Sequence, residues 1–274
     1  MKKRILRWRF ILLFLLSLPF ICFSQIVDIP DKNFKKCLLG IMEINSNRDK
    51  EIQVSEANSF KGSIDCRGLK IKNLKGIEKF TALTWLSCGE NQLKTLDVSK
   101  NLALKVLNCS NNKLTTLDVS KNIALLSLNC MENKLTTLDI SINIDLEYLC
   151  CQENKLKELI SANAKLRTLI CTVNQLSTLD VGKNNALEEL RCSGNKLASL
   201  DITNNTSLNF LTCAYNKLTI LDLSKNSALR DLRCNKNQLK SLDISNNMVL
   251  KYLLCDYRKL DKKSKNIISQ FGLK

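Results

Sequence analysis

The chain has 274 residues, of which 45% are apolar and 25% charged, with only 8 Gly and 2 Pro. This composition supports a buried core and excludes an intrinsically disordered chain. The formal net charge is +16, and the absence of histidine excludes histidine-based triads, histidine-ligated metals and imidazole acid–base catalysis.

Residues 1–24 have the pattern of a secretory signal peptide. Five basic residues accompany an apolar stretch from Phe10 to Ile21, and Cys22 and Ser24 are small residues suited to cleavage before Gln25. The stretch is short for a membrane span, so an uncleaved anchor is the less favoured alternative. A lipoprotein is less favoured still, because bulky Ile21 precedes Cys22. We therefore predict an extracytoplasmic protein, with no transmembrane span after cleavage.

Removal of this segment leaves 37 basic and 26 acidic residues, a net charge of +11. Such a charge favours acidic glycans or lipid headgroups as partners. Nucleic acid is the partner that an exported location argues against.

Residues 25–63 are predicted to form an N-terminal cap. Asp31 is placed to begin a helix that runs through Phe34 and Leu38, and a second short helix is predicted to start at Ser55. A solenoid needs such caps because its terminal apolar faces would otherwise lie open to water.

The loop between these two helices resembles an EF-hand calcium loop. Asn45, Asn47, Asp49 and Glu56 fall at ligand positions 1, 3, 5 and 12 of that motif. Asn rather than Asp stands at the first position, and Lys50 replaces the glycine that permits the sharp turn. We interpret the loop as degenerate and structural, with weak calcium binding at extracellular concentrations as the alternative.

From residue 64 to residue 257 a cysteine recurs almost every 21 residues. We call the following the ladder cysteines: Cys66, Cys88, Cys109, Cys130, Cys151, Cys171, Cys192, Cys213, Cys234 and Cys255. Around each one the pattern is Leu-x-x-Leu-x-Cys-x-x-Asn-x-Leu-x-x-Leu-Asp-x-Ser-x-Asn. One coil cannot bury its own apolar face, so a repeat of this length indicates a solenoid of stacked coils.

This repeat resembles the leucine-rich-repeat family, and in particular the internalin-like repeats of bacterial secreted proteins. The resemblance implies an α/β solenoid that winds as a right-handed superhelix, with a parallel β-sheet on its concave face and a mostly non-helical convex side. It also implies a protein-binding module. The Leu-x-Cys segments alternate and predict one short strand per coil. Residues 258–274 are predicted to form a C-terminal cap, with a helix from Leu260 to Phe271.

The interval from Cys151 to Cys171 is 20 residues, because the aspartate expected after Leu159 is missing. This deletion predicts a local kink or altered twist on the convex side near residues 159–163.

The ladder cysteines are predicted to be free, buried thiols. Equivalent positions in stacked strands lie about 4.8 Å apart, which is longer than the Cβ separation of about 3.8 Å in a disulfide. A straight column also lacks the convergent ligands of a zinc site. Cys150 alternates with Cys151 and is predicted to point outward and to be the most reactive thiol.

Two polar columns follow the ladder, and both are interpreted as structural. The asparagine column is Asn91, Asn112, Asn133, Asn154, Asn174, Asn195, Asn216 and Asn237. We expect these amides to be buried and to satisfy turn backbone groups between coils. The aspartate column is Asp97, Asp118, Asp139, Asp180, Asp201, Asp222 and Asp243. We predict that the Ser and Asn two and four residues later bond these carboxylates or the local backbone, and that the column does not bind calcium.

The functional prediction concerns the strand positions that flank each inward Leu, because they would lie on the open face of the sheet. Aromatic and Arg residues are enriched in binding hot spots, and apolar stripes on a monomer mark interaction sites. The predicted partner-binding residues are Trp85, Tyr148, Ile170, Arg191, Phe210, Arg233 and Tyr252.

These observations predict a non-catalytic protein-binding module with no cofactor. No cluster of chemically reactive residues interrupts the repeat, and catalytic sites usually break local sequence rules. A basic glycan-binding or envelope-binding protein is the first alternative. A thiol-based redox or metal protein is the second.

Overall fold

A computed structural model describes residues 25–272. The predicted signal peptide lies outside the described residues. The elements in chain order are α2 (Lys32–Leu39), α3 (Val54–Ser59), β1 (Ser63–Asp65), η1 (Ile77–Lys79), β2 (Trp85–Ser87), β3 (Val106–Asn108), β4 (Ser127–Asn129), β5 (Thr137–Asp139), β6 (Tyr148–Cys150), β7 (Glu158–Ile160), β8 (Thr168–Ile170), β9 (Glu189–Arg191), β10 (Phe210–Thr212), β11 (Asp231–Arg233), β12 (Tyr252–Leu254), η2 (Tyr257–Lys259) and α4 (Lys262–Gln270).

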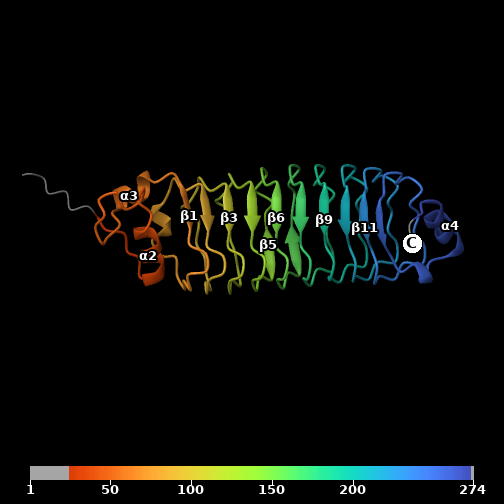
Figure 1. The fold of residues 1–274 in the computed structure, drawn as a ribbon, viewed down its shortest axis with the longest axis horizontal. Helices are drawn as coiled ribbons and strands as arrows, with labels where there is room; N and C mark the ends of the chain where they lie inside the picture. Colours follow the sequence, from red (N-terminus) through yellow and green to blue (C-terminus); the bar gives the residue numbers. More distant parts are fainter. Residues whose placement is uncertain (1–24, 273–274) are drawn as a thin grey trace, which may run out of the picture.

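The coils stack into an elongated solenoid with a helical cap at each end (Figure 1). Ten strands form one parallel sheet in the order β1-β2-β3-β4-β6-β8-β9-β10-β11-β12. Equivalent residues pair in register; for example, Leu190 of β9 lies opposite Leu169 of β8 and Leu211 of β10. The predicted solenoid with a parallel sheet is therefore confirmed.

The interior is a continuous stack of leucines and ladder cysteines. Within one coil, Leu104, Leu107, Cys109 and Leu114 are all fully buried. Each buried aliphatic side chain contributes roughly 1.5–3 kcal/mol, so adjacent coils stabilise each other through a shared apolar core. The ladder cysteines are free, and all except Cys255 are buried, as predicted.

The asparagine column ties consecutive coils together, also as predicted. The Asn112 Oδ1 atom accepts a hydrogen bond from the Leu93 N–H at 2.9 Å, and its Nδ2 atom donates to the carbonyl oxygens of Cys88 and Cys109 at 3.0 and 3.2 Å. Equivalent bonds recur from Asn91 to Asn237. These amides therefore serve the backbone of two coils at once and are not available as a ligand-binding strip.

The aspartate column forms tight turns, and the prediction for it is half correct. The Ser120 N–H donates to the Asp118 carboxylate at 2.8 Å, and this bond lowers the pKa of Asp118. Asn122 does not bond Asp118; it is fully buried and donates to the carbonyl oxygens of Val98 and Asn101, both at 2.9 Å. The second asparagine was assigned wrongly because inter-coil contacts are not visible in the local turn sequence.

The shortened coil, between Cys151 and Cys171, differs from the others on the side of the solenoid opposite the ten-stranded sheet. Here β7 pairs with β5 as a separate two-stranded parallel sheet. The Ser161 hydroxyl lies 3.2 Å from Asn163 Oδ1 and 3.3 Å from Asn184 Oδ1, and it also accepts from Asn184 Nδ2 at 3.0 Å. At the site of the deletion, the Ser161 hydroxyl therefore links two neighbouring coils.

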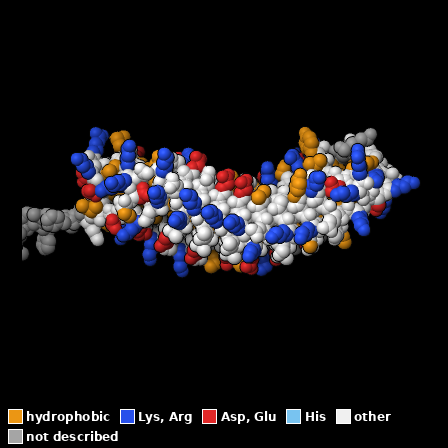
Figure 2. All heavy atoms as spheres, turned by 90° about the horizontal axis from the view of Figure 1, so that it is seen from below, with side chains coloured by type: hydrophobic (Ala, Val, Ile, Leu, Met, Phe, Trp, Pro, Cys, Tyr) orange, Lys and Arg blue, Asp and Glu red, His pale blue; other side chains and the backbone are white. Residues whose placement is uncertain are grey.

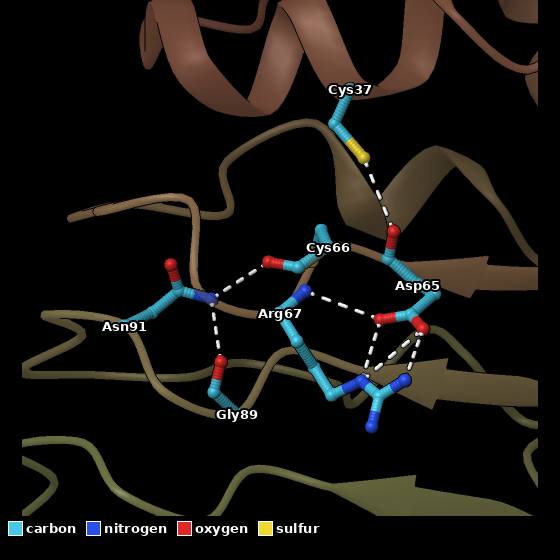
Figure 3. Close-up of polar contacts among 6 residues, drawn as sticks. All are labelled: Cys37, Asp65, Cys66, Arg67, Gly89 and Asn91. Atoms are coloured by element: carbon cyan, nitrogen blue, oxygen red, sulfur yellow. Dashed lines mark hydrogen bonds and ion pairs between the residues drawn. The ribbon is translucent and has the colours of Figure 1, made fainter.

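The N-terminal cap closes the first coil with α2 and α3. Asp31 caps α2, as predicted, by accepting hydrogen bonds from the N–H groups of Asn33 and Phe34. The Cys37 thiol on α2 donates to the Asp65 carbonyl of β1 at 3.4 Å (Figure 3). The cap is thereby joined to the edge strand of the sheet.

The C-terminal cap is shorter than the predicted helix from Leu260 to Phe271. The helix α4 begins after Asp261, whose carboxylate accepts from the Ser264 N–H at 2.8 Å, and it ends at Gln270. Leu260 and Ile268 are buried against the last coil. Among residues 25–272, no helix combines the length and the apolar composition needed to cross a membrane.

Candidate partner-binding surface

The outward side chains of the ten-stranded sheet form a continuous surface, which we call the sheet face. It carries all seven predicted binding residues, but each of them lies on a different strand, so they are distributed over seven strands. Trp85 on β2 is separated from Tyr148 on β6 by two intervening strands. The structure therefore does not gather the seven residues into one cluster.

Three of the predicted residues do form a compact cluster. The guanidinium groups of Arg191 and Arg233 lie 4.6 and 5.7 Å from the centre of the Phe210 ring, one from each neighbouring strand. Cation–π contacts of this kind are worth roughly 0.5–1 kcal/mol at exposed sites. The ring is thus held between two cations, and both arginines remain exposed.

Acidic neighbours orient these arginines. Arg191 forms an ion pair with Glu189, and Arg233 pairs with Asp231 at 3.1 Å, and the Asp231 carboxylate raises the pKa of Arg233. Each ion pair lies on one strand beside the ring, so the acidic side chains orient both guanidinium groups next to Phe210. Arginine and aromatic residues are enriched among the hot spots of protein interfaces.

Tyr148 forms a separate contact on β6. It is half-buried beside Cys150, and burial raises the pKa of Tyr148 to about 12. Cys150 points to the sheet face as predicted but is only 3% exposed, and burial raises the pKa of its thiol. The prediction that Cys150 is the most reactive thiol is therefore wrong, because larger neighbours on the face cover this small side chain.

The remaining predicted residues differ in exposure. Trp85 and Ile170 are half-buried, whereas Tyr252 on the last strand is 67% exposed, and Leu254 beside it is 52% exposed. The apolar character of the sheet face is therefore most accessible towards its C-terminal end.

A second feature was missed by sequence reasoning. The residue two positions after each ladder cysteine from Cys66 to Cys234 has positive φ, and these residues form a row that we call the rim. The rim residues are Gly68, Glu90, Asn111, Glu132, Glu153, Val173, Gly194, Tyr215 and Lys236, with φ between 48° and 68°. Glycine and asparagine suit this conformation, whereas a β-branched residue such as Val173 is strained in it.

The side-chain chemistry of the rim changes at the shortened coil. The N-terminal rim residues from Glu90 to Glu153 are acidic or polar, whereas Val173 and Tyr215 carry apolar side chains and Gly194 has no side chain. Val173 is 55% exposed and Tyr215 is 60% exposed. In Figure 2, acidic side chains lie near the hollowed upper edge at mid-length, and hydrophobic side chains follow towards the C-terminal end. The change could have been found by comparing this one position across the repeats.

The lateral surface beside the rim carries a row of lysines, visible along the length of the molecule in Figure 2. The row is Lys94, Lys113, Lys134, Lys155, Lys157, Lys196, Lys217 and Lys240. In the described part of the chain, none of these amino groups lies within 4.0 Å of a carboxylate. The row therefore accounts for much of the positive charge, and it lies beside the sheet face rather than on it.

The EF-hand-like loop is closed by hydrogen bonds of its own. The Glu56 carboxylate accepts from the Ser46 N–H at 3.1 Å and from the Gln53 N–H at 3.0 Å, where it also completes the capping box of α3. Asp49 and Asn47 bond each other at 2.9 Å. Asn45 is buried and donates to the Asp49 carbonyl oxygen. The side-chain oxygens of Asn47, Asp49 and Glu56 thus have structural partners in this conformation, whereas the buried Asn45 Oδ1 atom has no hydrogen-bond partner.

Other surface features repeat with the coils. Shallow grooves run beside the aspartate column at equivalent places, between Thr116 and Asp118, between Thr178 and Asp180, and between Ser241 and Asp243. Because they recur at equivalent positions, they are a property of the repeat rather than one specific site. Within residues 25–272, no group of three or more Cys, Asp or Glu side chains has the geometry to hold a metal ion.

The stacked 21-residue coils, the single parallel sheet and the inter-coil asparagines define a leucine-rich-repeat solenoid. Comparison with solved structures agrees, and the chain belongs to the leucine-rich-repeat family. It is similar to the functional domain of InlJ from Listeria monocytogenes, which is described as including a cysteine ladder. The identity is 31%, over 87% of this chain and 64% of that one, with a TM-score of 0.65. This chain therefore spans less than two thirds of that domain.

Two further structures share the fold. YopM from Yersinia enterocolitica is 26% identical over 72% of this chain and 45% of that one, with a TM-score of 0.58. Internalin C2 from Listeria monocytogenes is 14% identical over 87% of this chain and 98% of that one, with a TM-score of 0.59, and so shows the fold alone. No family model and no curated protein matches the sequence.

Proposed function

We propose that this chain is an exported, non-catalytic module that binds a folded protein partner through the sheet face of its C-terminal coils. The observation that carries the proposal is Phe210 held between Arg191 and Arg233, with both guanidinium groups exposed. Tyr148, Ile170 and Tyr252 would extend this contact along the sheet, and Trp85 would serve as a more distant anchor. The signal-peptide pattern of residues 1–24 supports an extracytoplasmic location.

The charge distribution supports a protein partner over a polyanion on the sheet face. Both exposed arginines of the cluster are already paired with carboxylates on their own strands. The lysine row, which has no such partners, lies elsewhere. A surface of paired charges around an aromatic ring is typical of protein interfaces, in which aromatic and Arg residues are enriched.

The test compares the wild-type chain with Phe210→Ala and with a matched control, Val106→Ala. Val106 occupies the same strand position in an N-terminal coil and is also half-buried. Each protein is immobilised and exposed to an extracytoplasmic extract, and the bound proteins are quantified. We expect Phe210→Ala to reduce recovery of the specific partner by at least tenfold and Val106→Ala to leave it unchanged. Equal recovery by all three proteins would refute the proposal.

The lysine row supports a second candidate function, the binding of acidic glycans or lipid headgroups. Unpaired cations in most of the coils, which are stacked about 4.8 Å apart, suit a linear polyanion, although the Cys171 coil contributes none to the row. Such binding would weaken steeply with salt because the charges are exposed. The test measures the dissociation constant for an acidic polysaccharide at salt concentrations from about 50 to about 300 mM, over which salt screens exposed charges more and more strongly. A dissociation constant that does not change with salt would argue against this candidate.

A further inference from the structure

The rim of the C-terminal coils combines two features that are typical of binding sites: exposed apolar side chains and a strained backbone conformation. Val173 and Tyr215 expose more than half of their apolar side chains, and both hold a left-handed backbone with φ near 52°. A β-branched residue is a genuine outlier there. Equivalent positions in the N-terminal coils hold Gly, Glu or Asn and no apolar side chain. Strained and exposed apolar residues cluster at binding sites.

Gly194 lies between these two residues and leaves a gap. Val173 and Tyr215 are two coils apart, which corresponds to a separation of about 10 Å. At this separation one apolar side chain can pack between them. A Cβ atom built on Gly194 would be in ordinary van der Waals contact with Val173 at 3.5 Å, so a small side chain fits here without a clash and the gap is the volume of the side chain that glycine lacks. The backbone beneath the gap is fixed, because the Gly194 N–H donates to the Ala214 carbonyl at 2.9 Å.

The C-terminal segments around this gap carry an excess of positive charge. The four segments that run from the ladder cysteines along the lateral surface, residues 171–178, 192–199, 213–220 and 234–241, contain four lysines and no acidic residue. The corresponding N-terminal segments contain five lysines and four glutamates. Acidic residues lie at both ends of the C-terminal segments: Glu153 is the rim residue next to Val173, and Asp256 accepts from the Lys236 N–H.

We propose that the rim around Gly194 is a subsite for an acidic polypeptide segment, with one apolar side chain of that segment seated between Val173 and Tyr215. The flanking carboxylates of the segment face Lys196, Lys217 and Lys236. The inference rests on the proposed function in one respect, since the segment would belong to the partner that the sheet face binds. It adds the chemistry of the partner and a contact surface beyond the strands.

The test uses three blocked pentapeptides, Glu-Glu-Leu-Glu-Glu, Glu-Glu-Ala-Glu-Glu and Lys-Lys-Leu-Lys-Lys, titrated into the isotope-labelled full chain. Backbone amide shifts are followed by NMR. We expect the first peptide to move the signals of Val173, Gly194 and Tyr215. The alanine peptide should bind at least fivefold more weakly, and the lysine peptide should not move these signals.

The variant Gly194→Asn fills the gap and keeps the backbone, since Asn111 holds the same rim conformation at φ 48°. It should weaken binding of the leucine peptide at least fivefold, whereas the matched control Asn111→Gly should not change it. Equal binding of the leucine and alanine peptides, shifts confined to N-terminal coils, or no shifts at millimolar peptide would each overturn the subsite.

The two proposals fail separately. Phe210→Ala leaves the rim intact and should not affect the peptide, whereas it should abolish partner capture. A rim that binds no peptide, combined with a loss of capture in Phe210→Ala, would refute the subsite alone.

Discussion

The coils of Cys88, Cys109, Cys130 and Cys151 and the coils of Cys171, Cys192, Cys213 and Cys234 bury equivalent leucines and asparagines. Their surfaces differ. The rim of the N-terminal set holds three glutamates and Asn111, and its sheet face has no arginine. The rim of the C-terminal set holds Val173, Gly194, Tyr215 and Lys236, and its sheet face has the Arg191–Phe210–Arg233 cluster. The periodic interior therefore specifies the fold, and the proposed recognition depends on departures from periodicity at the surface.

The largest expected effect concerns the shared interior at alkaline pH. Burial raises the pKa of Cys109 and of Cys213 from 9.0 to about 12. The unfolded chain therefore loses protons that the folded chain retains, so stability is fully present below pH 9 and is lost as pH rises from 9 towards 12. Each such thiol should lower the free energy of unfolding by about 1.4 kcal/mol at pH 10, and the sum over the buried ladder thiols therefore exceeds the cost of a single substitution.

Urea unfolding at pH 8 and pH 10 measures this loss. Cys109→Ala and Cys213→Ala should each reduce the pH dependence by the same amount, since one thiol comes from each set of coils. A pH-independent free energy of unfolding would show that the ladder thiols are not buried, and unequal effects would break the equivalence of the two interiors.

The next effect concerns the asparagine column. Asn133 and Asn195 make matching bonds, each accepting from a leucine N–H at 3.0 Å and donating to two cysteine carbonyls. Replacing either with Ala leaves a buried N–H unpaired and should cost about 3 kcal/mol, because unsatisfied buried groups cost about 1–3 kcal/mol each. Equal losses of unfolding free energy in chemical denaturation would support the equivalence of the N-terminal and C-terminal interiors. A difference above about 1 kcal/mol between the two variants would contradict that equivalence.

A smaller effect should distinguish the two rims. Val173→Asn places a residue that tolerates the left-handed conformation where a strained one now lies, and should raise the free energy of unfolding by about 1 kcal/mol. Glu132→Asn, the matched change on the N-terminal rim, should raise it less. Thermal unfolding of both variants measures the difference, and a Val173→Asn variant less stable than wild type would show that Val173 is not strained.

The smallest expected effect is that of calcium, which tests a region outside both sets of coils. The cap loop is interpreted as degenerate, and even a site with a dissociation constant of about 1 mM would stabilise the folded chain by only about 0.4 kcal/mol in 1 mM calcium. Asp49→Asn should remove this increment. A rise in Tm of several degrees in wild type, absent in the variant, would instead identify the cap loop as a functional calcium site.

The repeated features were predictable because each depends on a short sequence pattern. Leu-x-Cys alternation predicts the strands, and stacking predicts that Cys109 and Asn112 are buried. Cys150 was placed on the correct face but given the wrong exposure, since alternation specifies direction and not what neighbouring strands cover. The second asparagine, Asn122, was misassigned because its acceptors lie in the preceding coil.

The candidate site was only partly predictable. The sequence identified Phe210, Arg191 and Arg233, but their contact arises from diagonal neighbours on three strands, which becomes visible only when the register is known. The rim was missed because Val173 and Tyr215 are not residue types that normally adopt positive φ. Nothing in their identity indicated a turn, although Gly194 between them did.

Hydrogen–deuterium exchange of the full chain, alone and with the protein recovered by wild type but not by Phe210→Ala, tests the central claim most directly. We predict slower exchange in residues 189–194, 210–215 and 231–236, and unchanged exchange in residues 85–90, 106–111 and 127–132. Protection confined to the second group would place recognition on the N-terminal coils and contradict the account.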